Sequence, residues 1–291
     1  LTEATATYTA KLNDIHQLGA LVGVSAEKFK ANGNNSGNNN FLTDGFSWNN
    51  LNAGSGTKIV GSWGNENNIM SYFTRLNYTL LDRYLLTATF RADGASVFAK
   101  NNKWGFFPSV AIAWNMADEE FMQFMNPAVS MLKLRISFGQ TGNSSIGSNA
   151  FASYYAMPAW NNADDTPQIG VFQARLENPD LKWETTTELN FGLDFSMLQG
   201  RIGGSFEYYQ RVISDLLNYK LLNTYQDISF VMANIGKTQS KGFEATINTK
   251  NITKPDFAWN TDFIFSMYRD NWLERTTDWK PNVYENATDP I

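Results

Sequence analysis

The stretch SYFTRLNYTLLDRYLLTATFRAD, residues 71–93, decides the fold. Two sets of side chains alternate in its first half, namely Tyr72, Thr74, Leu76, Tyr78 and Leu80 against Ser71, Phe73, Arg75, Asn77 and Thr79. Its second half sets Leu86, Ala88, Phe90 and Ala92 against Thr87, Thr89, Arg91 and Asp93. Successive side chains of a β-strand point to opposite faces, so this period of two predicts two strands. With a turn at Leu81-Asp82 between them, the stretch is predicted to form a β-hairpin.

The same period of two recurs along the chain in segments of about ten to thirteen residues. Ten such segments begin near residues 4, 15, 71, 86, 109, 132, 183, 202, 240 and 257. Strands of this length are long for a soluble domain, but they suit a tilted strand that crosses a bilayer. Lys133 and Arg135 alternate with leucines in one of these segments, which indicates that one face of the sheet is wet.

The connections between the segments alternate in length. Short links fall near Asn13, Asp82, residues 118–130, Gln199 and residues 251–256, and longer polar links near residues 29–67, 96–103, 141–182 and 215–238. Transmembrane barrels have short periplasmic turns and longer outer loops, so the alternation predicts an all-β, antiparallel, up-and-down transmembrane β-barrel. We expect one short helix, from Asp118 to Pro127, with acidic residues in its first turn.

The composition agrees with a wall between lipid and water. Aromatic residues make up 14% of the 291 residues and charged residues 18%, while mean hydropathy is −0.35. Strands that are apolar on one side and polar on the other combine these properties. The net charge of −5 argues against a nucleic-acid partner, which would require a basic surface. No run of roughly eighteen apolar residues is present, so a membrane would be crossed by strands.

Several stretches closely resemble the SusC/RagA-like family of TonB-dependent outer-membrane transporters. They are RYLLTATFRADGASVFAKNNKWGFFPSVAIAW (83–114), LKLRISFGQTGN (132–143), NPDLKWETTTELNFGLDF (178–195), RIGGSFEYYQRVISDLL (201–217) and NIGKTQSKGFEATINT (234–249). They occur in the family's order and cover most of the chain. The resemblance implies a 22-stranded barrel in the outer membrane of a Gram-negative bacterium. It also implies an N-terminal plug, a TonB box and a SusD-like surface lipoprotein as a lid.

We expect residues 1–291 to be part of a single barrel domain, about ten strands of the larger barrel. No plug-like segment, TonB box or final aromatic strand is recognised in the sequence, so we expect these parts to lie outside this chain. The resemblance implies a nutrient importer that takes up oligosaccharides or peptides. Two alternatives remain open: a passive outer-membrane pore or structural barrel, and a secreted β-sandwich binding protein, adhesin or enzyme.

Enzyme chemistry finds little support in the sequence. The chain has no cysteine and one histidine, His16, which excludes zinc-thiolate sites, cysteine nucleophiles and His-based triads. Glu184, Glu188 and Asp194 share one face of a strand, but four residues along a strand span about 13 Å, too far for a glycosidase pair. Asp164-Asp165 lacks the pattern of a calcium loop. We therefore expect no catalytic residues, no metal and no cofactor.

Two groups of residues are candidates for function. We expect a polar lumen wall formed by Arg75, Arg91, Arg135, Glu184, Glu188 and Asp194, and a lipid-facing surface that includes Leu76, Phe90, Ile136 and Phe191. The longer loops combine aromatic rings with amides, which suits sugar rings or peptides. The loop candidates for ligand binding are Trp48, Asn49, Tyr154, Tyr155, Trp160 and Asn161. Loop packing or contact with the lid protein is the alternative role for these six.

Overall fold

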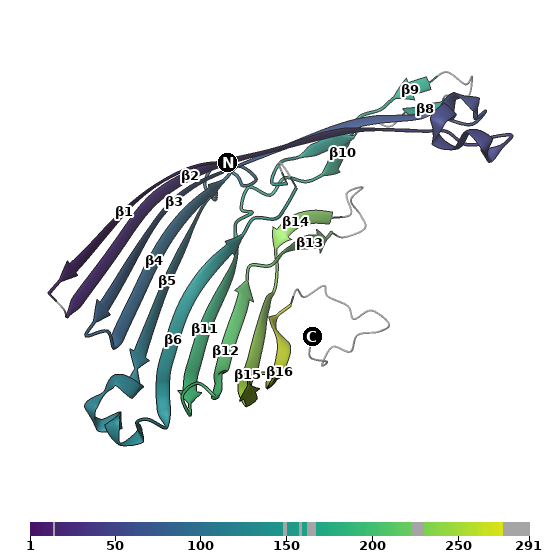
Figure 1. The fold of residues 1–291 in the computed structure, drawn as a ribbon. Coiled ribbons are helices and arrows are strands. Elements are labelled where there is room, and N and C mark those ends of the chain that lie inside the picture. The colour runs from purple at the N-terminus through teal and green to yellow at the C-terminus, as the bar shows by residue number, and fades with distance from the viewer. Residues whose placement is uncertain (14, 148–149, 157–158, 162–166, 223–229, 276–291) are drawn as a thin grey trace.

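The computed structural model describes residues 1–13, 15–147, 150–156, 159–161, 167–222 and 230–275. Ten strands form one antiparallel sheet: β1 (Thr2–Leu12), β2 (His16–Gly37), β3 (Ile59–Leu80), β4 (Tyr84–Ala95), β5 (Trp104–Asn115), β6 (Val129–Asn143), β11 (Glu184–Met197), β12 (Ile202–Ser214), β15 (Lys237–Lys254) and β16 (Phe257–Glu274). Each strand pairs with the next of these along the chain. Figure 1 shows the sheet as an open, curved wall. The ten expected strands and their up-and-down order are confirmed.

The strand register gives the wall two contrasting faces. One row of paired positions crosses all ten strands at Ala10, Leu18, Tyr78, Leu86, Ile112, Ile136, Phe191, Tyr208, Phe243 and Met267. The next row contains Thr9, Gly19, Asn77, Thr87, Ala111, Ser137, Asn190, Tyr209, Gly242 and Tyr268. We call the faces that carry these rows the apolar face and the polar face. The period of two read along single strands is therefore in phase across the whole sheet.

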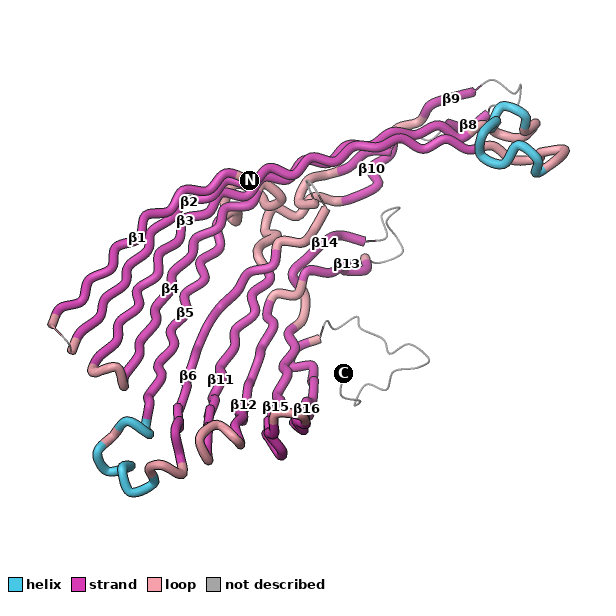
Figure 2. The backbone as a smooth tube through the Cα atoms, in the orientation of Figure 1, coloured by secondary structure: helices cyan, strands magenta, loops and turns pink. Residues whose placement is uncertain are grey.

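Short and long connections lie at opposite ends of the wall (Figure 2). The turn between Leu80 and Tyr84 is short because Leu81 and Asp82 adopt left-handed backbone, with φ of 55° and 56°. The connection between β6 and β11 carries two small two-stranded sheets, β7 (Tyr154–Ala156) with β10 (Phe172–Arg175) and β8 (Ala159–Asn161) with β9 (Pro167–Ile169). The connection between β12 and β15 carries a third, β13 (Leu217–Leu221) with β14 (Phe230–Asn234). The predicted alternation of short and long links is thus confirmed.

The hydrophobic core lies where the long connections fold against the polar face. Phe98 and Leu181 are fully buried there, and Trp183 packs against Phe98 and Phe107 with ring centroids 5.4 Å apart in each pair. The indole Nε1 of Trp183 donates to the carbonyl of Lys103 at 2.9 Å. This cluster packs against the polar face at the end of the wall that carries the long connections.

Residues 29–67 form something other than the predicted loop. β2 and β3 remain paired as far as Gly37 and Ile59, well beyond their neighbours, and form a two-stranded arm. The 3₁₀ segment η1 (Asp44–Ala53) closes the arm, and the hydroxyl of Thr43 caps it by accepting from the backbone N–H of Gly45. An arm with no buried face needs no apolar alternation, so a search for that alternation ends the strands too early.

The predicted helix between Asp118 and Pro127 is also wrong in type. The structure has two 3₁₀ turns, η2 (Met116–Asp118) and η3 (Glu120–Met125), separated by an extended Glu119 with φ −82° and ψ 146°. The predicted turn at residues 251–256 is tighter than expected, because β15 and β16 pair up to Lys254 and Phe257 across a bulge near Lys250. None of the helical segments in the described residues is long and apolar enough to cross a membrane.

Candidate functional site

All six residues predicted to form a polar wall lie on the polar face. Arg75 and Glu188 belong to one row of paired positions, and Arg135, Gly192 and Glu207 belong to another. Arg91, Glu184 and Asp194 have the same parity along β4 and β11. The structure thus brings side chains from separate strands together into one charged surface.

Arg135 is the centre of a cluster formed by three strands. Its Nε and Nη2 donate to the two carboxylate oxygens of Asp194 at 2.7 and 2.8 Å, and Nη2 also donates to Glu207 at 2.9 Å. Asn190 donates to the other oxygen of Glu207 at 3.3 Å. A forked guanidinium suits such two-point contact with a carboxylate. The cluster holds β6, β11 and β12 side by side.

Gly192 leaves room for the Arg135 side chain to cross β11. It stands between Arg135 and Glu207 in the register, and a Cβ at this position would lie 2.9 Å from the guanidinium carbon of Arg135. The side chain therefore crosses β11 over a residue that has none. Glycine within a strand often marks such a close approach.

Arg211 stands between two hollows on the polar face. Its Nε donates to Glu188 at 2.7 Å, and its guanidinium lies 5.7 Å from the centre of the Tyr209 ring. The first hollow, of about 600 Å³, is lined by residues that include Thr87, Ser109, Ser137, Thr186 and Glu188. The second, of about 460 Å³, is lined by residues that include Tyr209, Gln239, Ser240 and Asp270. These hydroxyl, amide and charged groups match a ligand rich in hydroxyls or amides.

Arg91 and Arg75 have simpler surroundings. Arg91 donates from Nε to the Asp93 carboxylate and from Nη2 to the Ser71 hydroxyl, both at 2.8 Å. Its guanidinium also lies 5.4 Å from the centre of the Phe73 ring. Arg75 donates to the Thr89 hydroxyl at 3.4 Å. Because Ser71 and Asp93 are buried, Arg91 supports the wall where the arm leaves it.

Glu184 and Glu188 have separate partners. Glu184 accepts hydrogen bonds from Asn143 and from the backbone N–H of Leu217, both at 3.0 Å, so it ties β11 to the connection that carries β13. Glu188 is paired with Arg211 instead. The two carboxylates are therefore engaged in different contacts. Within the described residues, no group of three or more His, Asp and Glu side chains is placed to hold a metal ion.

The loop candidates lie beyond the end of the wall that carries the long connections. Trp48 and Asn49 belong to η1 at the tip of the arm, where Trp48 is 79% exposed. Tyr154 and Tyr155 belong to β7, and Trp160 and Asn161 to β8, which pair with different partners. The side chains of these last four lie outside what the structure describes. The structure therefore places their backbone at this end without assigning them a contact.

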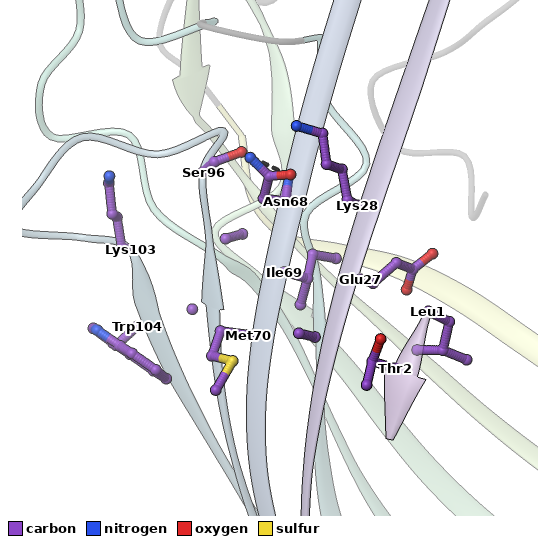
Figure 3. Close-up of a pocket in the computed structure, with 13 residues that line it drawn as sticks. Leu1, Thr2, Glu27, Lys28, Asn68, Ile69, Met70, Ser96, Lys103 and Trp104 are labelled. Carbon is purple, nitrogen blue, oxygen red and sulfur yellow. Dashed lines mark hydrogen bonds between the residues drawn. The ribbon is translucent and has the colours of Figure 1, made fainter. Parts of the chain in front are cut away.

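A further hollow, of about 490 Å³, opens beside Leu1, where β2 and β3 extend past the end of β4 (Figure 3). Asn68 and Ser96 exchange two hydrogen bonds there, both of 2.9 Å. Lys28 and Lys103 point the same way in the view, away from Met70. Lys28 pairs with Glu66 at 2.7 Å. Hydrogen bonds from Lys28 and Asn68 hold the pKa of Glu66 below its ordinary value.

Sequence reasoning missed Glu207 and Arg211. Both alternate with apolar residues of β12, so their parity was a sufficient signal for the face on which they lie. Their pairing with Arg135 and Glu188 depends on the register of three strands, which no single segment reveals.

Comparison with known proteins gives a consistent result. The family model described as TonB dependent receptor-like, beta-barrel, matches residues 2–289. TonB-dependent receptor P3 of Formosa agariphila is 40% identical over 263 residues, which are 89% of this chain and 26% of that protein. TonB-dependent receptor SusC of Bacteroides thetaiotaomicron is 38% identical over 236 residues, 79% of this chain and 23% of that protein. The chain therefore spans about a quarter of the length of these curated relatives.

Solved structures share the fold. The structure of the RagAB peptide transporter superposes on 94% of this chain and 30% of its own, with a TM-score of 0.81 and 23% identity. The outer membrane transporter YddB from Escherichia coli covers 93% of this chain, which spans 33% of YddB, with a TM-score of 0.60 and 11% identity. At these identities the likeness concerns the fold alone.

Proposed function

This chain belongs to the TonB-dependent receptor β-barrel family, found in the outer membrane of Gram-negative bacteria, and we propose on that premise that it forms part of the wall of an energy-coupled importer. The observation that carries the proposal is the pair of faces. Ten strands place an unbroken apolar row beside a polar one, as a wall between lipid and water requires. Passage along the polar face, rather than bond-making, is the chemistry that this wall provides.

The orientation follows from the two faces and the two ends. We place the apolar face against lipid and the polar face, with Arg75, Arg91, Arg135, Glu184, Glu188 and Asp194, against the lumen. The short turns then lie in the periplasm, and the arm and other long connections lie outside. A soluble β-sandwich would bury its apolar face under a second sheet, whereas Ile136 and Phe191 are 51% and 42% exposed.

The substrate class that we propose is oligosaccharides or peptides. The hollows beside Arg211 offer hydroxyl, amide and charged groups, which both classes use. The exposed ring of Trp48 beside Asn49 suits a first contact outside the barrel, and we extend that role to Tyr154, Tyr155, Trp160 and Asn161. The resemblance of the sequence to the SusC/RagA-like family implies these two classes, and RagAB, which shares the fold, is described as a peptide transporter.

The partners belong to the full-length protein. We propose that residues 1–291 are part of one barrel domain, and that the plug and the TonB box lie elsewhere in that protein. A SusD-like surface lipoprotein would cover the outer end, and TonB would supply the energy from the periplasm. The arm is placed to meet such a lid, because it extends beyond the neighbouring strands at the outer end.

Uptake by cells tests this function. The full-length gene is deleted from its host and restored, and the entry of fluorescent oligosaccharides and oligopeptides is measured with TonB intact and with TonB inactivated. We expect one of the two classes to enter only with the gene and TonB both present. Uptake that needs the gene but persists without TonB would indicate the passive pore. Recovery of the protein in soluble form without detergent would favour the secreted β-sandwich.

A further inference from the structure

A buried carboxylate lies on the apolar side of the wall, in the connection between β5 and β6. Glu119 is 9% exposed and accepts three hydrogen bonds: from the Tyr84 hydroxyl at 2.6 Å, from Trp114 Nε1 at 2.9 Å and from Arg83 Nη1 at 3.0 Å. Tyr84 and Trp114 are paired across β4 and β5, and their rings stack with centroids 6.3 Å apart. One carboxylate thus satisfies the polar atoms of two stacked aromatic side chains.

The position of these rings shows where the connection folds. Tyr84 and Trp114 belong to the apolar face, in the row that contains Leu12, Leu80, Leu134, Leu193 and Phe206. Phe121 packs on Trp114, with ring centroids 6.2 Å apart. The connection therefore folds over the apolar face at the end with the short turns, and Glu119 holds it there.

The turn η3 has distinct edges. Residues three apart eclipse one another in a 3₁₀ helix, so Phe121 and Phe124 share one edge, and Glu120 and Gln123 share another. Phe121 and Phe124 are 57% and 81% exposed. Glu120 and Gln123 are exposed as well. The exposed rings of Phe121 and Phe124 therefore continue outward from Trp114, which lies on the apolar face.

We propose that η3 is a membrane-interface anchor whose occupant is the periplasmic leaflet of the outer membrane. Phe121 and Phe124 enter the boundary between headgroups and acyl chains, and Glu120 and Gln123 face water. The argument for lipid is continuity, because the rings extend the apolar face through the stack of Tyr84, Trp114 and Phe121. Aromatic side chains gather at this depth in membrane barrels. The inference rests on the orientation of the wall proposed above.

Spin labels test the anchor. The full-length protein, in a background without other cysteines, carries one labelled cysteine at a time and is reconstituted into phosphatidylethanolamine and phosphatidylglycerol vesicles. The variants are Phe121→Cys, Phe124→Cys, Glu120→Cys, Gln123→Cys and, as a lipid-facing reference, Ile136→Cys. We compare the label's collision rates with oxygen, which is concentrated in lipid, and with a water-soluble nickel chelate. Each variant must first show, in gel electrophoresis, the change of mobility on heating that is typical of a folded barrel.

We expect labels at positions 121, 124 and 136 to collide mainly with oxygen, and labels at positions 120 and 123 to collide mainly with the nickel chelate. Nickel-dominated collisions at 121 and 124 would overturn the anchor, since the rings would then face water. Protection from both reagents would also overturn it, because protein would then cover the turn. The reference separates the two proposals: an oxygen-accessible label at 136 with a water-exposed label at 124 rejects the anchor and leaves the wall orientation standing.

A second comparison tests Glu119 as the positioning residue. In the Phe124→Cys protein, we expect Glu119→Ala to make the spin label more mobile. We also expect it to reduce the ratio of the label's collision rate with oxygen to its collision rate with nickel several-fold. Glu120→Ala, which removes a neighbouring exposed carboxylate, is the matched control and should leave both values unchanged. An unchanged label in the Glu119→Ala protein would reject the role of Glu119.

Discussion

At the scale of single residues, Arg135 explains how charge is kept in a membrane wall. Its guanidinium makes paired contacts with Asp194 and a further contact with Glu207, while Gly192 leaves room for its side chain. Removing one member of a partly buried ion cluster leaves the other charges uncompensated, which costs more than the net value of an exposed pair. Arg135 should therefore matter more to stability than an arginine that is held by one hydroxyl.

The first prediction compares two arginines of the polar face. Arg135→Met leaves Asp194 and Glu207 without their shared cation, and we expect a loss of about 1–3 kcal/mol in the free energy of unfolding. Arg75→Met, which removes a hydrogen bond to the Thr89 hydroxyl, is the control and should cost less than about 1 kcal/mol. Urea unfolding of the full-length protein in vesicles measures both. Equal losses would contradict the account of the cluster.

The second prediction concerns pH and Glu119. Hydrogen bonds from Tyr84 and Trp114, followed by the charge of Arg83, hold the pKa of this carboxyl below its ordinary value. A carboxyl whose pKa is lowered in the folded state stabilises that state above its unfolded pKa, and the stabilisation disappears as pH falls through the folded pKa. The stability difference between the wild type and Glu119→Gln should therefore be constant near neutral pH and shrink below about pH 4.

Unfolding midpoints of both proteins, measured at several values between roughly pH 6 and pH 3, check this dependence. Glu120→Gln is the control, because it removes the exposed carboxylate next to Glu119 in the chain. A difference between wild type and Glu119→Gln that stays constant over the whole range would show that Glu119 has no such role.

At the scale of elements, alternation predicts the strands because one of their faces is mainly apolar. The sequence predicts β4, β6 and β11 from short stretches, since apolar residues occupy alternate positions over much of each strand. Alternation does not predict the arm of β2 and β3, because its outer half is rich in Asn, Gly and Ser on both faces. The sequence predicts one helix in place of the turns η2 and η3, because their acidic start and terminal proline suit both an α-helix and a 3₁₀ helix.

In the candidate site, too, the sequence predicts some features and not others. The face on which Arg135 and Glu188 lie follows from parity within one strand, so sequence was sufficient for it. Their partners Glu207 and Arg211 both come from β12, which neighbours β11 but lies two strands away from β6. The partner of Glu119 on β4 lies 35 positions away in the sequence. Such contacts depend on register and on the fold of a connection, which a period of two does not encode.

The third prediction belongs to strand β11. Gly192→Leu places a side chain where the Arg135 guanidinium crosses the strand, so we expect the contact with Glu207 to break and stability to fall by about 1–3 kcal/mol. Gly19→Ala, on the polar face of β2, is the control, because a Cβ there meets Asn77 at an ordinary 3.7 Å. The double variant Gly192→Leu, Arg135→Met tests whether the two residues act together. If they do, adding Arg135→Met to the Gly192→Leu protein should cause only a small further loss of stability. Fully additive losses would contradict the crossing.

At the scale of the whole molecule, the part of the wall that the structure describes ends in two edge strands. In the ten-strand sheet β1 pairs with β2 and β16 pairs with β15, so each has one neighbour. Exposed strand edges and a broad apolar face together favour aggregation when a membrane is lacking. The chain spans about a quarter of its curated relatives, and experiments on the wall therefore belong in the full-length protein.

The central claim is that one face of the wall meets lipid and the other meets water, and cysteine labelling tests it most directly. Single cysteines replace Leu76, Ile136 and Phe191 on the apolar face, and their neighbours Asn77, Ser137 and Asn190 on the polar face, in the full-length protein without other cysteines. A membrane-impermeant, water-soluble thiol reagent is then applied to folded protein in open membranes. We predict labelling at 77, 137 and 190 and protection at 76, 136 and 191. Labelling at 76, 136 and 191 with protection at the other three would contradict the account and identify a soluble β-fold whose apolar face is not in lipid.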